Sequence, residues 1–334
     1  MKDIAELAGV SITTVSHVIN ETRVVADATK TRVLEAISTT GYTGDAIARS
    51  LVTGGGTRSL GVAISLVANP YFAELIQAIE GEASAAGHTL LLVDTHDEPE
   101  AEQESVRMLR ARRVDGLLLT PSSGAASAVL PELRRRGIPT VLLDRVHDDQ
   151  PFDQIGPENV DSTASLVEHL ADLGHRRIGL VSGATGLGTS TERILGYRLG
   201  LDHAGLPWDP DLIASGESTN KLGAAALHRL LDLPAPPTAV VAGNNTMLVG
   251  VLHAARDRGV RIGKDLAVVG YDDVEWADLV DPPLTTVAQP IAKIGRTAVR
   301  MLLSRILDPS RPPETVRLPA VLMHRQSCGC LSPS

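Results

Sequence analysis

The fold at the head of the chain is decided by residues 3–20, which read DIAELAGVSITTVSHVIN. Ile4 and Leu7 lie three residues apart, the spacing of one helical face. Gly9 suits the left-handed end of that helix, and Ser11 is a preferred N-cap for a second one. Two short helices joined by a tight, glycine-containing turn are typical of a helix-turn-helix.

The same periodicity predicts a second and a third helix. The second carries Val15, Val18 and Ile19 on one face. The third runs over about 28–39, with Asp27 as its cap. Its predicted inward side chains are Val33, Leu34 and Ile37. These three helices are enough to form a small bundle with its own apolar core.

The outer face of the second helix carries short hydrogen-bonding side chains: Thr13, Thr14, Ser16, His17 and Asn20. A helix that is merely solvated is richer in Glu and Lys. Contact with DNA is therefore one interpretation of this face. A three-helix bundle without any role in DNA binding is the alternative, and periodicity alone does not separate the two.

Composition and charge describe an ordinary globular protein. The chain has 334 residues, of which 43% are hydrophobic and 21% charged, enough for two or three cores. Its net charge is −9, but residues 1–58 contain as many basic as acidic residues, so the rest of the chain carries the whole excess. A neutral head permits local nucleic-acid binding without demonstrating it. A charged N-terminus and the lack of a long apolar run predict a cytoplasmic protein with no membrane contact.

The two cysteines, Cys328 and Cys330, exclude a disulfide framework. Their C-x-C spacing is compatible with metal binding or with thiol chemistry, but no His or Cys cluster joins them in the sequence. We therefore expect free thiols, no metal site and no cofactor. The sequence also lacks a nucleophile–base constellation and paired catalytic carboxylates, so we expect no catalytic residues and no enzymatic activity.

The remainder of the chain alternates strands with helices. Strand-length apolar runs occupy 60–67, 89–93, 116–120 and 140–144, separated by amphipathic stretches at 72–86, 99–113 and 126–136. A second series has strands near 177–182, 212–215, 239–242 and 267–270 and helices near 161–173, 192–204, 220–232 and 246–258. This pattern predicts two doubly wound α/β lobes with parallel sheets. A ligand site is expected in the crevice at the strand carboxyl ends.

Half of the eight aromatic residues follow predicted strands directly: Tyr71, Phe72, Tyr271 and Trp276. Aromatic side chains at strand exits offer a stacking surface for a small molecule in the cleft. The alternative is that they close the ends of the hydrophobic cores.

Residues 183–190, GATGLGTS, follow a predicted strand and match the glycine spacing of a P-loop. Thr189 stands where that motif needs the lysine that neutralises the β- and γ-phosphates. The loop is therefore predicted to line the ligand pocket rather than to bind a nucleoside triphosphate.

The run 3–20 closely resembles the DNA-binding headpiece of the LacI/GalR family of bacterial transcription regulators. The resemblance continues through further motifs along the whole chain: GY at 41–42, AIARSL at 46–51, DR at 144–145, GHRRIG at 174–179, GYDD at 270–273 and PLTTV at 283–287. It implies a headpiece (1–44), a hinge helix with linker (45–58), and an effector-binding and dimerisation domain (59–334). In that domain it implies a periplasmic-binding-protein-like clamshell, with an N-lobe of about 59–158 and 291–319 and a C-lobe of about 159–290 and 320–334.

For DNA, the resemblance implies that the second helix lies in the major groove of an operator. Ile12, Thr13 and His17 would read base edges, with Ile12 packing on a thymine methyl group. The remaining contacts would go mainly to phosphates: Ser11, Thr14, Ser16, Asn20 and Arg23. A partly buried core position is the alternative for Ile12.

The family's hinge motif covers 45–52, where Asp45 is a suitable helix cap. So short a helix is not stable alone in water. In the family, paired hinge helices of a homodimer enter the minor groove, which places Ala48 and Leu51 there, with Leu51 as a wedge between base steps. An ordinary linker with Leu51 packed on the body is the alternative. Asp45 for asparagine, Val52 for a basic residue and a longer glycine run at 54–56 depart from the family pattern.

For the effector, the resemblance places a set of polar and aromatic residues on the cleft walls: Asn69, Tyr71, Phe72, Asp144, Arg193, Asn244, Asp272 and Trp276. Arg193 and Asp272 are expected to face each other across the ligand within one lobe, each satisfied mainly when the cleft is occupied. This donor and acceptor set suits a polyhydroxylated, sugar-like effector. Leu187 stands where the family's purine-responsive member has an arginine, which disfavours a purine.

The sequence thus predicts a ligand-controlled repressor that binds a near-palindromic operator as a dimer. The chain ends too soon after Cys330 for a C-terminal leucine heptad, so we expect no tetramer. A free solute-binding protein of the same clamshell fold is the alternative function, and an enzyme on a doubly wound fold is a third.

Overall fold

The computed structural model describes residues 1–20, 23–40, 56–122, 129–147 and 150–330. The chain divides into two compact units, a head of Met1–Ser59 with Arg113–Asp115, and a body of Leu60–Arg112 with Gly116–Ser334. Among the described residues, no helix is long and apolar enough to cross a membrane.

The head is a bundle of three helices, α1 (Lys2–Ala8), α2 (Ile12–Asn20) and α3 (Asp27–Thr40). Gly9 ends α1 with φ 63°, a left-handed conformation that glycine adopts without steric cost. The Ser11 hydroxyl accepts a hydrogen bond from the Thr14 amide at 3.1 Å and so caps α2. The helix-turn-helix that the sequence predicts is therefore present.

The core of the head differs in detail from the prediction. Leu7 and Leu34, expected to point inward, are 58% and 50% exposed. Small residues fill the space between the helices instead, because an alanine lets two short helices cross more closely than a leucine does. The buried residues are Ile4, Ala5, Ala8, Val15, Val18, Val33 and Ala36.

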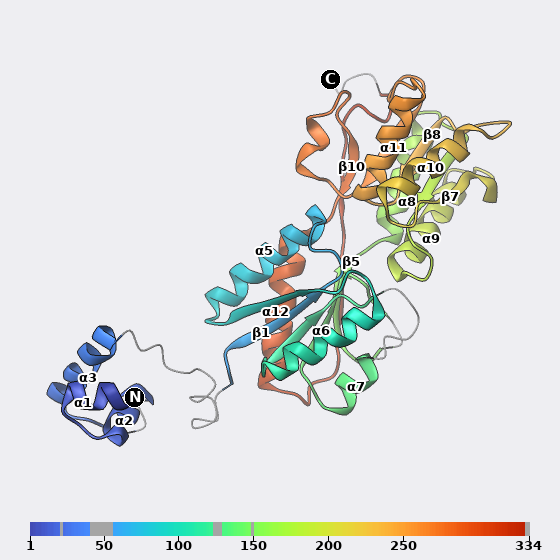
Figure 1. Cartoon of the computed structure of the whole chain (residues 1–334). Helices are drawn as coiled ribbons and strands as arrows, with labels where there is room; N and C mark the ends of the chain where they lie inside the picture. Colours follow the sequence, from blue (N-terminus) through green and yellow to red (C-terminus); the bar gives the residue numbers. More distant parts are fainter. Residues whose placement is uncertain (21–22, 41–55, 123–128, 148–149, 331–334) are drawn as a thin grey trace. The chain divides into compact units, whose positions relative to one another are not determined.

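The first lobe of the body contains a parallel sheet with the strand order β11-β5-β4-β3-β1-β2. Figure 1 shows α5 and α12 packed against each other beside this sheet, with α6 and α7 covering its other face. Its strands are β1 (Ser59–Ile64), β2 (Thr89–Asp94), β3 (Gly116–Leu119), β4 (Thr140–Leu143), β5 (Asp153–Pro157) and β11 (Thr315–Leu318). Its helices are α5 (Pro70–Ala85), α6 (Pro99–Ala111), α7 (Val129–Arg135) and α12 (Ile291–Leu307).

The second lobe repeats this plan with the strand order β12-β10-β9-β8-β6-β7 (Figure 1), in which β12 alone runs antiparallel to its neighbour. Helices α8 and α9 pack together, and so do α10 and α11. Its strands are β6 (Ile178–Ser182), β7 (Ile213–Ser215), β8 (Ala239–Ala242), β9 (Ala267–Tyr271), β10 (Thr285–Ala288) and β12 (Val321–Met323). Its helices are α8 (Val160–Asp172), α9 (Gly188–His203), α10 (Asn220–Leu231) and α11 (Asn245–Asp257), with short 3-10 turns at Pro210–Leu212 and Glu275–Asp278.

The predicted architecture of two doubly wound lobes is confirmed. The chain passes from one sheet to the other between β5 and α8, between β10 and α12, and between β11 and β12. Because the strand order turns back beside β1 and beside β6, each lobe opens a crevice at the carboxyl ends of these strands.

The elements that the prediction omits are β5, β10, β11, β12 and α12. Strand β5 reads DQIGP and has no apolar run. Its Asp153 is buried all the same, because both carboxylate oxygens pair with the Arg305 guanidinium at 2.8 and 3.0 Å. A strand that buries an ion pair of this kind lacks the apolar run from which a buried strand is predicted.

Candidate functional site

One pocket, which we call the interlobe pocket, is lined by residues that follow the carboxyl ends of strands in both lobes. Its first wall follows β1, β2 and β4, and its second wall follows β6 to β10. The lining residues are Leu66, Asn69, Tyr71, Phe72, Asp97, Asp144, Arg145, Gly183, Leu187, Thr189, Ser190, Arg193, Ser218, Gly243, Asn244, Asp272 and Gln289.

The first wall is built around Tyr71 and Asp144. Asn69 caps α5 by accepting the Tyr71 amide, which fixes the aromatic pair of Tyr71 and Phe72 at the helix start, with ring centroids 5.0 Å apart. The Tyr71 hydroxyl donates to Asp144 Oδ1 at 2.7 Å. Burial raises the pKa of Tyr71 well above its usual range and also raises the pKa of Asp144. Tyr71 is therefore a donor and Asp144 an acceptor held in an apolar setting.

Arg145, the residue after Asp144, is buried beside the same wall. Its guanidinium donates to Asp97, to the Pro121 carbonyl and to the Ser65 hydroxyl. Three partners from separate loops hold this cation in place, so it acts as a fixed positive charge at the strand ends.

The second wall is built around Arg193 of α9. Its guanidinium carbon lies 3.7 Å from the centre of the Tyr271 ring. Its Nε donates to Asn159 Oδ1 at 3.0 Å and its Nη1 donates to the Gly243 carbonyl at 2.6 Å. Tyr271 is fully buried, and its hydroxyl donates to the Glu158 carbonyl at 3.1 Å. Its ring therefore supports the Arg193 guanidinium but does not line the pocket.

Asp272 is the acceptor of the second wall. It accepts from the Asn245 amide at 3.1 Å and from Gln289 Nε2 at 2.5 Å. The expectation that Arg193 and Asp272 find their partners mainly in an occupied cleft is wrong. Both are already held by the protein, because a charged side chain removed from water needs compensation before any ligand arrives.

All three carboxylates that line the pocket share a backbone feature, a positive φ, which is 59° at Asp97. Asp144 has φ 65° and Asp272 has φ 77°, each directly after its strand, β4 or β9. An L-residue adopts this left-handed region at a cost, and such strain concentrates at functional positions. This left-handed conformation turns the carboxylates of Asp144 and Asp272 out of the strand direction and toward the pocket.

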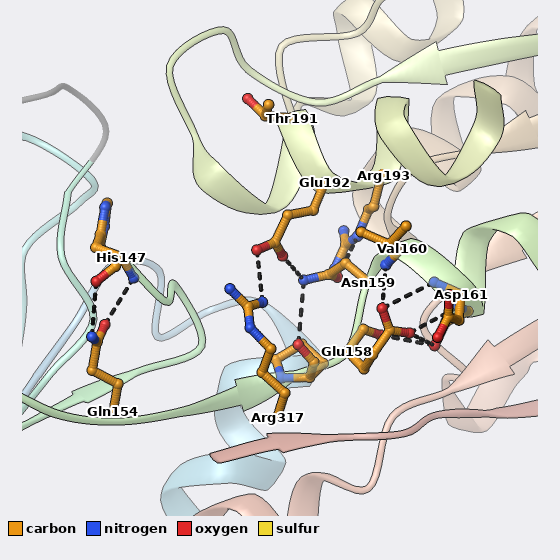
Figure 2. A network of polar contacts seen from close by, with 12 residues as sticks. His147, Gln154, Glu158, Asn159, Val160, Asp161, Thr191, Glu192, Arg193 and Arg317 are labelled. Atoms are coloured by element: carbon orange, nitrogen blue, oxygen red, sulfur yellow. Dashed lines mark hydrogen bonds and ion pairs between the residues drawn. The ribbon is translucent and has the colours of Figure 1, made fainter. Parts of the chain in front are cut away.

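A network of polar contacts joins the second wall to the crossing segments (Figure 2). Glu192 of α9 accepts from Asn159 Nδ2 at 2.7 Å and from Arg317 Nη1 of β11 at 2.7 Å. Asn159 in turn accepts from Arg193 in the pocket. The Glu158 carboxylate accepts three amide hydrogens at the start of α8, which anchors the first crossing.

The structure brings most of the predicted effector residues together. Asn69, Tyr71, Phe72, Asp144, Arg193, Asn244 and Asp272 all line the interlobe pocket. Trp276 does not line it but packs, partly buried, against the core of the second lobe that includes Val274 and Ala277.

Sequence reasoning missed several lining residues. Arg145 belongs to a family motif but was not predicted to line the pocket, although it lies just after the predicted strand 140–144, at the crevice. Asp97 and Gln289 follow β2 and β10 at the same sheet edges. The signal for all three is position after a strand, and β10 was not predicted.

The fold brings two histidines close to Cys328, which the sequence did not predict. His169, His324 and Cys328 bring their ligand atoms within 4.8 Å of one another. His169 is far from His324 and Cys328 in the sequence, so no local spacing predicts this cluster.

The candidate DNA-contacting face of α2 is solvent-accessible in the head. Ile12 is 50% exposed and does not belong to the core of the head, which disfavours the alternative of a partly buried core position. Ser11, Thr13 and Arg23 are exposed as well. Thr14, Ser16 and His17 are partly buried. The Asn20 side chain and the hinge residues Ala48 and Leu51 lie outside the described residues.

Comparisons with known proteins identify both parts of the chain. Residues 1–45 match the model for bacterial regulatory proteins of the lacI family, and residues 167–328 match a periplasmic binding protein-like domain. Over 328 residues, the chain is 37% identical to the HTH-type transcriptional repressor PurR of Yersinia pestis bv. Antiqua, covering 98% of this chain and 96% of that protein. The chain belongs to the lacI family.

Solved structures of lacI-family regulators agree with this assignment. A lac repressor dimer bound to operator and the anti-inducer ONPF is 30% identical with a TM-score of 0.87, and covers 98% of each chain. A complex of the transcriptional regulator CelR with cellobiose is also 30% identical, with a TM-score of 0.76 and 98% of each chain covered. Because the headpiece and the clamshell match together, the chain is a DNA-binding transcriptional regulator of the family and not a free solute-binding protein.

Proposed function

We propose that this regulator represses transcription by binding a near-palindromic operator as a homodimer, and that a sugar-like effector in the interlobe pocket controls this binding. The observation that carries the effector proposal is the convergence of Asp144, Arg193 and Asp272 on one pocket at the strand ends of both lobes. The dimer and the operator are supported by the related lac repressor complex.

The pocket chemistry favours a ligand with several hydroxyl groups. Asp144 and Asp272 are acceptors for hydroxyl donors, while Arg193 supplies donors to hydroxyl oxygens. The buried Gln289 Oε1 has no hydrogen-bond partner among the residues that the structure describes, so an acceptor is left for a ligand hydroxyl. The edge-to-face pair of Tyr71 and Phe72 offers apolar area to one face of a pyranose ring.

The crossing network supplies the proposed link between effector and operator. Arg193 contacts Asn159, which contacts Glu192, which pairs with Arg317 of the other lobe. A ligand that engages Arg193 changes the free energy of the interlobe arrangement only if it binds one arrangement better than another. We propose that lobe closure on the ligand provides this difference.

On DNA, we propose that Ile12, Thr13 and His17 read base edges and that Ser11, Thr14, Ser16, Asn20 and Arg23 hold phosphates. Arg23 is a cation on the exposed surface of the head, which suits a phosphate contact. We also propose the headpiece, hinge and lobe boundaries given above, with Ala48 and Leu51 as the minor-groove contacts.

Two measurements test the proposal. The first is a thermal-shift screen of the full chain with monosaccharides, cellobiose, nucleosides and free bases, in which a sugar should raise the melting temperature. A response to free bases alone would overturn the sugar assignment. The second is a gel-shift experiment on DNA upstream of the protein's own gene, with and without the hit, at several salt concentrations. Failure to bind any such fragment under both conditions would overturn the repressor proposal.

A further inference from the structure

The second lobe contains a group of nitrogen and sulfur ligands that the effector pocket does not use. His169 lies in the last turn of α8, His324 directly follows β12, and Cys328 and Cys330 lie in the segment after it. Three side chains converge from separate parts of the chain: the ligand atoms of His169, His324 and Cys328 all lie within 4.8 Å of one another.

Cys330 completes the group. Its sulfur lies 3.1 Å from His324 Nε2 and 3.4 Å from Cys328 Sγ. In a tetrahedral zinc site, bonds of about 2.3 Å to sulfur and about 2.0 Å to nitrogen place neighbouring ligand atoms roughly 3.3–3.8 Å apart. The two contacts of Cys330 are therefore a few tenths of an ångström shorter than in such a site, whereas the group of His169, His324 and Cys328, which spans up to 4.8 Å, has to close by up to about 1 Å to hold an ion.

A second observation points to a ligand at this place. His169 Nε2 is buried and has no hydrogen-bond partner among the residues that the structure describes. A buried imidazole nitrogen without a partner is costly, because its desolvation is not repaid. The His169 and His324 rings lie edge to face with centroids 4.8 Å apart.

The surroundings suit a structural ion. Cys328 is fully buried in the core that includes Leu166, Leu170 and Val269, so one side of the cluster is apolar. The other side is reached from solvent, because Cys330 lines a surface hollow together with Lys264 and Gln326. An ion thus has an entry path and, once bound, a partly dry site.

We propose that His169, His324, Cys328 and Cys330 form a site for a transition-metal ion of zinc type. Two thiolates and two imidazoles are the ligand set that zinc prefers in closed structural sites. Bound there, the ion ties the segment after β12 to the end of α8, and α8 starts at the first crossing between the lobes. The site therefore stabilises the second lobe at the chain segments that carry the crossing contacts.

The experiment uses the full chain, purified under reducing conditions, stripped with a chelator and titrated with Co²⁺ and then with Zn²⁺. Tetrahedral cobalt–thiolate coordination gives intense visible bands and a near-ultraviolet charge-transfer band, and we expect both to saturate at one ion per chain. Zn²⁺ should then displace Co²⁺ and raise the melting temperature.

Variants separate ligation from folding. Cys330→Ser and His324→Ala change residues outside the buried core, and each should weaken cobalt binding by at least about tenfold, the loss that even outer-shell changes cause at metal sites. Cys328→Ser tests the buried ligand. His253→Ala, an exposed histidine of α11, is the matched control and should leave the titration unchanged.

The proposal fails if Co²⁺ gives no tetrahedral spectrum, or if Cys330→Ser and His324→Ala bind it as well as the unmodified chain. It also fails if the freshly purified chain has a mass lower by two hydrogen atoms and takes up Co²⁺ neither before nor after reduction. That result would assign Cys328 and Cys330 to a disulfide.

Discussion

Arg317 of β11 and Glu192 of α9 form an ion pair that joins the two lobes of the body, with 2.7 Å between Nη1 and Oε1. The two side chains are 30% and 19% exposed, so water screens the pair only in part. The other Glu192 oxygen accepts from Asn159, which holds the pocket residue Arg193. The Glu192 carboxylate therefore takes part both in the contact between the lobes and in the network that positions Arg193 in the pocket.

Glu192→Gln keeps the shape of this side chain but removes its charge. The contribution of a partly buried ion pair is about 1 kcal/mol, so effector affinity should fall about fivefold. Isothermal titration with the ligand found in the screen measures this change. Glu82→Gln is the control, because it removes an ion pair with Arg300 within the first lobe, at 2.7 Å and with Arg300 68% exposed. Equal affinities in both variants would show that Glu192 has no part in the pocket.

Asp272→Asn should separate the pocket from operator binding. The amide retains an oxygen for the Asn245 amide hydrogen, so the fold should survive, but it is a weaker acceptor for a ligand hydroxyl. We expect effector binding to weaken by about 1–3 kcal/mol, roughly 5- to 150-fold, while operator affinity without effector stays unchanged. Circular dichroism checks the fold. An unfolded variant would assign Asp272 a structural role, and unchanged effector affinity would place the ligand elsewhere.

The sequence was sufficient for the architecture because the strands β1, β3, β6 and β8 are almost wholly apolar and alternate with amphipathic helices. It was insufficient for strands whose buried polar groups are paired. Asp153 in β5 is buried only because Arg305, from a helix far along the chain, neutralises it. No local pattern contains that partner.

The same limit applies to the site. The family resemblance placed Asn244 and Asp272 in the crevice, and both line the pocket, where each lies just after a strand. What those side chains bind in the folded chain was not visible. The Asp272–Gln289 contact and the stacking of Arg193 on Tyr271 depend on how loops from different strands meet.

The buried carboxyl of Asp144 predicts a dependence of stability on pH. Burial raises its pKa above 3.8, so the native state holds this proton more tightly than the unfolded chain does. This contribution to the free energy of unfolding is present below about pH 4 and is lost as the pH rises through the folded pKa. Asp144→Asn removes it, so urea unfolding should favour the variant progressively more as the pH rises above about 4.

Tyr71→Phe is the matched test of this interpretation. The Tyr71 hydroxyl donates to Asp144 and lowers its pKa, so its removal should raise that pKa further and steepen the loss of stability with rising pH. A free-energy difference between Asp144→Asn and the unmodified chain that is constant with pH would contradict the assignment.

Leu51→Ala tests the hinge that the family resemblance implies. If Leu51 wedges between base steps, its loss should reduce specific operator affinity by a few kcal/mol and reduce the DNA bend angle. Non-specific binding should keep nearly the same salt slope, and effector affinity measured without DNA should not change. Unchanged operator affinity together with an unchanged bend angle would show that the headpieces bind without the hinge.

Arg23→Ala and His17→Ala should weaken DNA binding in two different ways. Arg23 is an exposed cation at the end of the helix-turn-helix, so its removal should lower affinity for every sequence alike and reduce the slope of log affinity against log salt by about 1.

His17 lies on the candidate DNA-contacting face of α2, so its removal should cost about 1–3 kcal/mol on the operator only and relax the preference at one base pair. Fluorescence anisotropy on the operator and on single-base variants, at several salt concentrations, measures both effects. Thr39→Ala is the control for a change within the head, because it removes a hydrogen bond to the Glu35 carbonyl on α3 and no proposed DNA contact. If His17→Ala shifted all sequences equally, His17 would be a phosphate contact, and base reading by α2 would then depend on Ile12 and Thr13.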